Sequence, residues 1–139
     1  MRIIIKASLL FIVVFFFSCE KEGLFVKCAD CVADEPEKIS LDVKLDINYN
    51  GAGTTINVYE GNLEDSVLYR TFNTSGTTTT IQVTVNKKYT VTATYYVPDD
   101  YYVAIDSATP RVKYEKSQCK DPCYYVYDKN IDLRLKYTN

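Results

Sequence analysis

Apolar and polar residues alternate with a period of two along most of the chain beyond residue 39. The clearest run places Leu41, Val43, Leu45 and Ile47 between Asp42, Lys44, Asp46 and Asn48. Similar runs recur at 56–59, 67–72, 80–85, 89–96, 103–105, 111–115, 124–127 and 131–137, with turn-forming residues between them, as at 106–110. Because the side chains of a strand point alternately to opposite faces, each run predicts a half-buried strand. No apolar stripe of helical period and length follows residue 20, so residues 39–139 are predicted to form an antiparallel β-sandwich of about seven to nine short strands.

One hairpin is predicted down to its register. The sequence YYVPDDYY is nearly palindromic about Pro98, whose fixed φ suits the first central position of a turn. This arrangement pairs Tyr96 with Tyr101 and Tyr95 with Tyr102, so that one pair faces the core and the other faces outward. Exposed tyrosine offers a large amphipathic contact area for a glycan or a protein, and the alternative is cross-strand packing alone. The candidate binding residues are Tyr96, Tyr101, Tyr102 and Tyr125.

Residues 1–18 have the pattern of an export signal. Arg2 and Lys6 precede an apolar run over 7–17 that is interrupted only by Ser8. Eleven helical residues span about 16 Å, roughly half of a hydrocarbon core of about 30 Å. We therefore predict a secretory signal rather than an uncleaved membrane anchor.

The end of this segment, Phe16, Phe17, Ser18 and Cys19, resembles a lipobox. The sequence that follows, Glu-Lys-Glu over 20–22, resembles the acidic export signal of Bacteroidota-type surface lipoproteins. The resemblance implies that Cys19 is lipidated, and that the protein is anchored by lipid in the outer membrane and faces the cell surface. The alternative is an ordinary signal peptide followed by an unmodified cysteine.

Four further cysteines form two clusters, Cys28 with Cys31 and Cys119 with Cys123. Residues 19–38, which include the first cluster, are rich in charge and predicted to be a tether. In an oxidising compartment an even number of cysteines predicts two disulfides. Pairing between the clusters would close loops of roughly 90 residues, worth about 4 kcal/mol for the first bridge, so it is favoured over local pairing. A Cys₄ zinc site and a thioredoxin-like redox pair are the alternatives.

The composition excludes several activities. The chain has no His, so it lacks a Ser-His-Asp triad and an imidazole base. Removal of Arg2 and Lys6 with the signal leaves 14 basic against 18 acidic residues, a net charge of −4, which argues against nucleic-acid binding. We expect no enzymatic activity, no cofactor and no metal. The weighed alternatives are a paired-carboxylate hydrolase and a calcium site formed by Asp99, Asp100 and Asp106.

Two further resemblances concern the body of the chain. The segment TIQVTVNKKYTVTA over 80–93 resembles the central hairpin of transthyretin-like, Ig-like domains in exported bacterial proteins. Residues 119–124 match a Cys-x-x-Pro-Cys-Tyr feature of small Bacteroidota-type lipoproteins with that fold. The resemblance implies a non-catalytic binding or accessory module on the outer membrane. The alternatives are a structural or anchoring subunit of a fimbria-like assembly, whose strand exchange would need a displaceable terminal strand, and an inhibitor-type binder.

Two serines are candidate O-glycosylation sites. Ser66 and Ser107 each follow an aspartate and precede an aliphatic residue, in Asp-Ser-Val and Asp-Ser-Ala. This order resembles the O-glycosylation motif of Bacteroidota-type exported proteins, and both serines are predicted to lie in loops.

Overall fold

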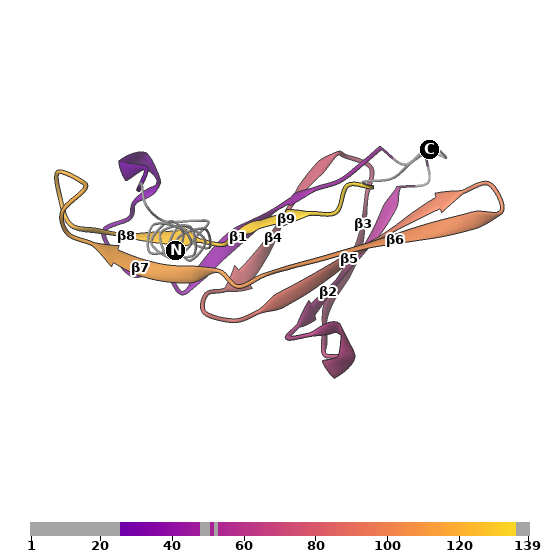
Figure 1. Cartoon of the computed structure of the whole chain (residues 1–139), viewed down its shortest axis with the longest axis horizontal. Helices are drawn as coiled ribbons and strands as arrows, with labels where there is room; N and C mark the ends of the chain where they lie inside the picture. The colour runs from indigo at the N-terminus through magenta and orange to yellow at the C-terminus, as the bar shows by residue number, and fades with distance from the viewer. Residues whose placement is uncertain (1–25, 48–50, 52, 136–139) are drawn as a thin grey trace, which may run out of the picture.

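The computed structural model describes residues 26–47, 51 and 53–135, which form nine strands and two short 3-10 helices (Figure 1). The strands are β1 (Lys38–Lys44), β2 (Thr54–Glu60), β3 (Leu68–Thr74), β4 (Thr78–Thr84), β5 (Tyr89–Val97), β6 (Asp100–Ala108), β7 (Arg111–Glu115), β8 (Cys123–Tyr127) and β9 (Asn130–Asp132). The helices are η1 (Cys28–Asp30) and η2 (Leu63–Asp65). The prediction of an all-β chain with seven to nine short strands is confirmed. No helix within the described ranges is both long and apolar enough to cross a bilayer.

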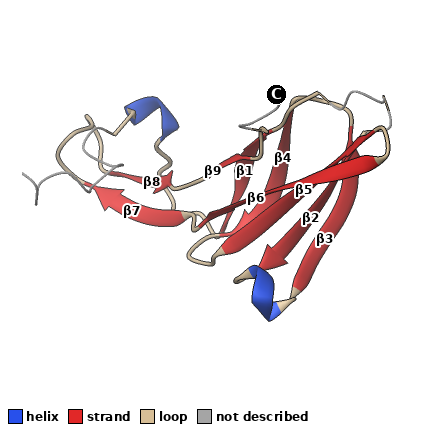
Figure 2. Ribbon diagram, turned by 45° about the vertical axis from the view of Figure 1, so that its right-hand side comes forward, coloured by secondary structure: helices blue, strands red, loops and turns tan. Residues whose placement is uncertain are grey.

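The strands belong to three sheets. One sheet has the order β3-β2-β5-β6, a second has the order β4-β1-β9, and β7 pairs only with β8 (Figure 2). All pairs are antiparallel except β1 with β9, which run parallel. That pair departs from the predicted all-antiparallel arrangement.

The apolar positions of the alternating runs form one core that the two larger sheets share. The buried inward side chains of β1, β2, β4 and β5 are at most 2% exposed. Each large aliphatic side chain removed from water contributes about 1.5–3 kcal/mol, so this shared layer holds the two sheets together. The core comprises Leu41, Val43, Leu45, Ile56, Val58, Ile81, Val83, Tyr89, Val91, Ala93, Tyr95, Ala108, Ile131 and Leu133.

The β5–β6 hairpin has the predicted register. Tyr96 lies opposite Tyr101 and Tyr95 lies opposite Tyr102. Pro98 and the next residue form the two-residue turn, whose second position has φ +65°. An aspartate tolerates this left-handed conformation better than most residues, which explains its position directly after the proline.

Two predicted boundaries in the C-terminal half of the chain are wrong. The predicted turn at 106–110 begins later, because β6 continues through Ala108 opposite Tyr89. The predicted strand over 131–137 instead begins at Asn130 and ends at Asp132, after which the Leu133 amide makes a last hydrogen bond to the Lys44 carbonyl. Residues 136–139 lie outside the described residues.

A buried tyrosine explains why β1 and β9 end where they do. The Tyr95 hydroxyl donates to the carbonyl of Leu133 (2.9 Å) and accepts from the amide of Asp46 (3.1 Å). The Asp46 carboxylate in turn accepts from the amide of Leu135. These side-chain partners replace ladder hydrogen bonds, so the chain leaves the sheet after Lys44 rather than at residue 48, and after Asp132. Burial also raises the pKa of the Tyr95 hydroxyl.

Candidate functional site

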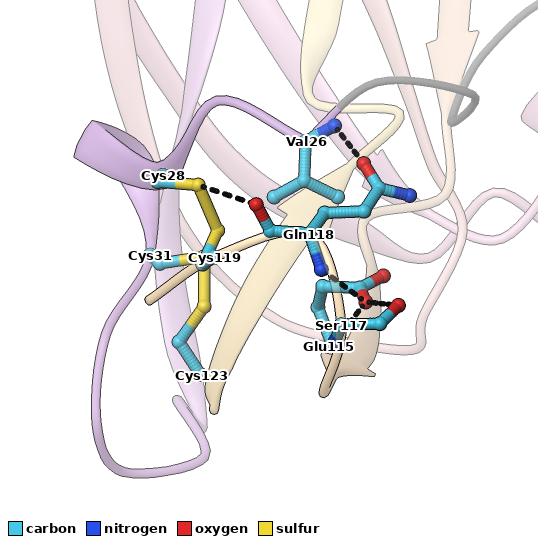
Figure 3. The surroundings of a disulfide bond; sticks show 8 residues. All are labelled: Val26, Cys28, Cys31, Glu115, Ser117, Gln118, Cys119 and Cys123. Atoms are coloured by element: carbon cyan, nitrogen blue, oxygen red, sulfur yellow. Dashed lines mark hydrogen bonds between the residues drawn. A yellow bond between two sulfur atoms is a disulfide. The ribbon is translucent and has the colours of Figure 1, made fainter. Parts of the chain in front are cut away.

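The two cysteine clusters meet at one end of the molecule. Disulfides join Cys28 to Cys119 and Cys31 to Cys123, with Cα–Cα distances of 5.6 and 5.5 Å (Figure 3). Both distances lie in the usual range for a disulfide. The predicted cross-pairing between the clusters is confirmed, and it fastens the segment before β1 to the loop between β7 and β8 and to the first residue of β8.

Hydrogen bonds around the disulfides bring the same two segments together. Val32 and Tyr124 exchange a pair of backbone hydrogen bonds of 2.9 and 2.8 Å, which forms an isolated antiparallel bridge. The amide of Val26 donates to the side-chain oxygen of Gln118 at 3.0 Å (Figure 3). We call residues 26–32 with the loop 116–122 and its two disulfides the cysteine clamp.

Glu115 shapes the loop that carries Cys119 and leads to Cys123, the first residue of β8. Its side chain is 7% exposed, and one carboxylate oxygen accepts from the amide and hydroxyl of Ser117 and the amide of Gln118 at 2.8, 2.9 and 3.1 Å. These hydrogen bonds, led by the one from the Ser117 amide, lower the pKa of the Glu115 carboxyl. The ionised carboxylate therefore organises the turn that presents Cys119.

The two alternatives to structural disulfides, a Cys₄ zinc site and a thioredoxin-like redox pair, both require free thiols. The sulfurs do lie close together, with Cys31 Sγ 4.0 Å from Cys119 Sγ. All four cysteines of the two clusters nevertheless form disulfides, and η1, which begins at Cys28, is a single 3-10 turn followed by the isolated bridge at Val32. A redox-active pair requires a longer helix at this position.

Exposed aromatic and aliphatic side chains gather on the β5–β6 hairpin, at the end of the molecule opposite the cysteine clamp (Figures 1 and 2). Tyr96, Tyr101 and Tyr102 are 46%, 61% and 49% exposed. Val103 and Ile105 of β6 continue this set at 46% and 55%. We call these five residues the hairpin patch, in which Tyr102 lies on the sheet face of Tyr95 and the other four lie on the opposite face.

Tyr102 is more exposed than predicted, because the pair that it forms with Tyr95 was expected to lie wholly in the core or wholly on the outside. Tyr95 faces the core at 2% exposure, whereas Tyr102 opposite it is half exposed. Strand β6 is at the edge of its sheet, with β5 as its only neighbour in that sheet, so Tyr102 is flanked on one side alone. The same edge position exposes Val103 and Ile105, which the sequence pattern alone assigned to an ordinary strand.

Tyr125 lies elsewhere in the fold. It sits on β8 opposite Lys113, is 7% exposed and contacts the ring of Tyr127 with centroids 6.2 Å apart. Its hydroxyl has no hydrogen-bond partner among the described residues. The structure therefore brings together three of the four candidate binding tyrosines and leaves Tyr125 apart from them.

The two candidate glycosylation serines are both exposed but differ in setting. Ser66 follows η2 with a left-handed backbone, φ 54° and ψ 24°. Ser107 lies in β6 rather than in a loop, and its amide is bonded to the Asp106 carboxylate. Ser66 thus lies in a loop, as predicted, whereas Ser107 does not.

The aspartates considered for calcium do not converge. Asp99 is in the hairpin turn, while Asp106 lies farther along β6 and faces Val91. Six residues of strand separate Asp100 from Asp106 by about 20 Å. Both carboxylate oxygens of Asp106 accept backbone amides, from Ser107 and Asp132, each at 2.8 Å. Asp106 thus links β6 to β9.

A groove of about 300 Å³ lies between the segment before β1 and strand β8. Its walls combine the apolar side chains of Val32, Ile39 and Val126 with the charged groups of Asp30 and Lys129. The sequence pattern gave no indication of it, because the disulfides that bring its walls together join residues about 90 positions apart.

Cys19 and the export segment 1–18 lie outside the described residues. Comparisons with protein-family models, with curated proteins and with solved structures find no match for this chain. The function is therefore argued from the residues and the fold themselves.

Proposed function

We propose that this chain is a non-catalytic binding module, anchored in the outer membrane by a lipid on Cys19 and exposed at the cell surface. In this proposal residues 39–139 are a β-sandwich of the transthyretin-like, Ig-like kind. The ligand is a glycan or a surface protein.

One observation carries the proposal, namely the opposite placement of the clamp and the patch. The cysteine clamp ties the segment that follows Cys19 to one end of the domain, and the hairpin patch lies at the other end (Figure 1). A domain held at its clamped end would present its exposed tyrosines away from the membrane. Tyrosine provides contact area at low entropic cost, which suits the recognition of sugars and proteins.

The arrangement of β1 weighs against assembly by strand exchange. This strand lies between β4 and β9 and pairs with both, and Cys31 is covalently held a few residues before it. Its displacement would break two ladders while its N-terminal side remained linked to Cys123. The binding role is therefore preferred to a fimbria-like subunit.

The anchor is tested in cells that produce the full chain. We expect Cys19→Ser to release the protein from the membrane fraction into the soluble fraction. Cys119→Ser is the matched control, because it also removes one thiol but leaves Cys19 in place. Membrane retention of the Cys19→Ser protein would contradict the lipid anchor.

The patch is tested with the full chain on an array of immobilised glycans and with surface proteins from the producing cell. We expect a variant that carries serine at 96, 101 and 102 to lose at least tenfold in binding. Tyr114→Ser is the control, since Tyr114 is 44% exposed but lies on β7. Equal binding by the triple variant and the native chain would refute this surface as the binding site.

A further inference from the structure

Strand β6 presents an edge whose hydrogen-bonding groups can be assigned from the register. In a two-residue hairpin the pair next to the turn is hydrogen-bonded, and hydrogen-bonded and non-hydrogen-bonded pairs then alternate. The pair next to this turn is Val97 with Asp100. The amide and carbonyl groups of every second residue of β6 therefore point away from β5, namely those of Tyr101, Val103, Ile105 and Ser107.

Side chains cap the two outer members of this set. The amide of Tyr101 donates to the carboxylate of Asp100 at 2.7 Å, and the amide of Ser107 donates to that of Asp106 at 2.8 Å. Among the described residues no such side-chain cap lies on Val103 or Ile105. The edge is therefore symmetric about Ala104. The open amides of Val103 and Ile105 flank this residue, and the capped amides of Tyr101 and Ser107 lie beyond them.

We propose that a second copy of this chain occupies the edge, with β6 paired antiparallel to β6 about a two-fold axis at Ala104. In this register Val103 of each copy lies opposite Ile105 of the other, and the four open amides form four interchain hydrogen bonds. An isologous contact requires a surface that complements itself under a two-fold rotation, and the symmetric order of open and capped groups meets this requirement.

The side chains suit this register. Residues in a non-hydrogen-bonded pair approach most closely, with Cα atoms about 4.5 Å apart, and the pair on the axis would be the two small Ala104 side chains. No like charges lie opposite each other, because Asp106 faces Tyr102 and Asp100 faces Ala108 of the other copy. Val103 opposite Ile105 forms two β-branched pairs on the outer face.

The available area determines how tight the contact is. The contact joins only one edge strand of each copy, so it buries less than the roughly 800 Å² per partner of a standard stable interface. We therefore expect a weak dimer, which is best detected by covalent trapping. Pairing would also place the two hairpin patches side by side, so that one ligand could contact both. The dimer does not depend on the proposed binding function.

The experiment traps the pair in bacterial cells that produce the full chain. In Ala104→Cys the two new thiols would face each other across the axis, so we expect mild oxidation to give at least five times more disulfide-linked dimer than in Asn73→Cys. The control carries the same extra thiol at an exposed position of the other edge strand, β3. Equal trapping of the two variants overturns the proposal.

Proline at 103 tests the hydrogen bonds, since it removes an amide that β5 does not use. In the Ala104→Cys background, we expect Val103→Pro to reduce trapping to the Asn73→Cys level and Val103→Thr to preserve it. Trapping that survives Val103→Pro overturns the proposed register. Failure to trap Ala104→Cys refutes pairing with a second copy of the chain. If Val103→Pro then also weakens ligand binding, the edge binds a different partner. The cysteine comparison decides the proposal even if the proline variant fails to fold.

Discussion

The two disulfides are expected to stabilise the fold in a strongly non-additive way. We consider replacement of the Cys28–Cys119 pair by serines, replacement of the Cys31–Cys123 pair by serines, and both replacements together. Either bridge alone closes nearly the same long loop, since the sequence separations are 91 and 92 residues. The cost of losing one bridge therefore depends on whether the other remains.

The chain-entropy relation gives the magnitudes. Closing a loop of about 90 residues in the unfolded chain contributes about 4.6 kcal/mol to the free energy of unfolding. Once one bridge is present, the second closes only about seven residues, those between the paired cysteines of each cluster, and contributes about 2.4 kcal/mol. Loss of either bridge should thus cost about 2.4 kcal/mol, and loss of both about 7 kcal/mol.

The assay is urea unfolding of the full chain under non-reducing conditions, followed by the far-ultraviolet circular dichroism of the strands. With 13 tyrosines and no tryptophan, tyrosine fluorescence provides a second probe. If the cysteines paired within each cluster, either replacement would already break both bridges, so the single and the double replacements would all cost the same, about 3.5 kcal/mol. A double replacement that costs no more than the sum of the single ones would therefore refute the reasoning.

Two further predictions concern single side chains. Tyr95→Phe leaves the Asp46 amide and the Leu133 carbonyl without their partner, so we expect a loss of about 1–3 kcal/mol in urea unfolding. Tyr101→Phe, at an exposed position, should change stability by less than about 0.5 kcal/mol, and equal losses would contradict this role of Tyr95. Because hydrogen bonds lower the pKa of Glu115 in the folded chain, its carboxylate stabilises the fold above its ordinary value of 4.5, and this contribution is lost as the pH falls through the lowered value. Glu115→Gln should therefore destabilise the protein at pH 7 and lose this difference in acid, as thermal melts between pH 2 and 7 would measure; a difference independent of pH would contradict it.

Local patterns predicted most of the strands, because alternation and turn chemistry act over a few residues. The register of β5 with β6 followed from Pro98 and the tyrosines on either side of it. The end of β1 at Lys44 did not follow, because it depends on the Tyr95 hydroxyl, which comes from a strand of the other sheet.

Less of the candidate site could be predicted, because it too depends on contacts between segments that are distant in the sequence. Cross-pairing of the cysteines followed from loop entropy, but the partner of each cysteine is set by the fold of the loop around Glu115. The exposure of Val103 and Ile105 depends on the position of β6 at the edge of its sheet. Strand order arises from contacts between distant segments, and alternation within one strand contains no information about it.

The disulfides also determine how a pull on the chain would be transmitted. The Cys28–Cys119 bond closes the backbone into a covalent ring that contains β1 to β7, and only β8 and β9 follow the clamp. Tension between a point before Cys28 and a point after Cys123 runs through sulfur and bypasses the seven strands of the ring. The strands of the ring, with the hairpin patch, would therefore not carry this load, whereas β9, which contributes Ile131 to the core, lies outside the ring.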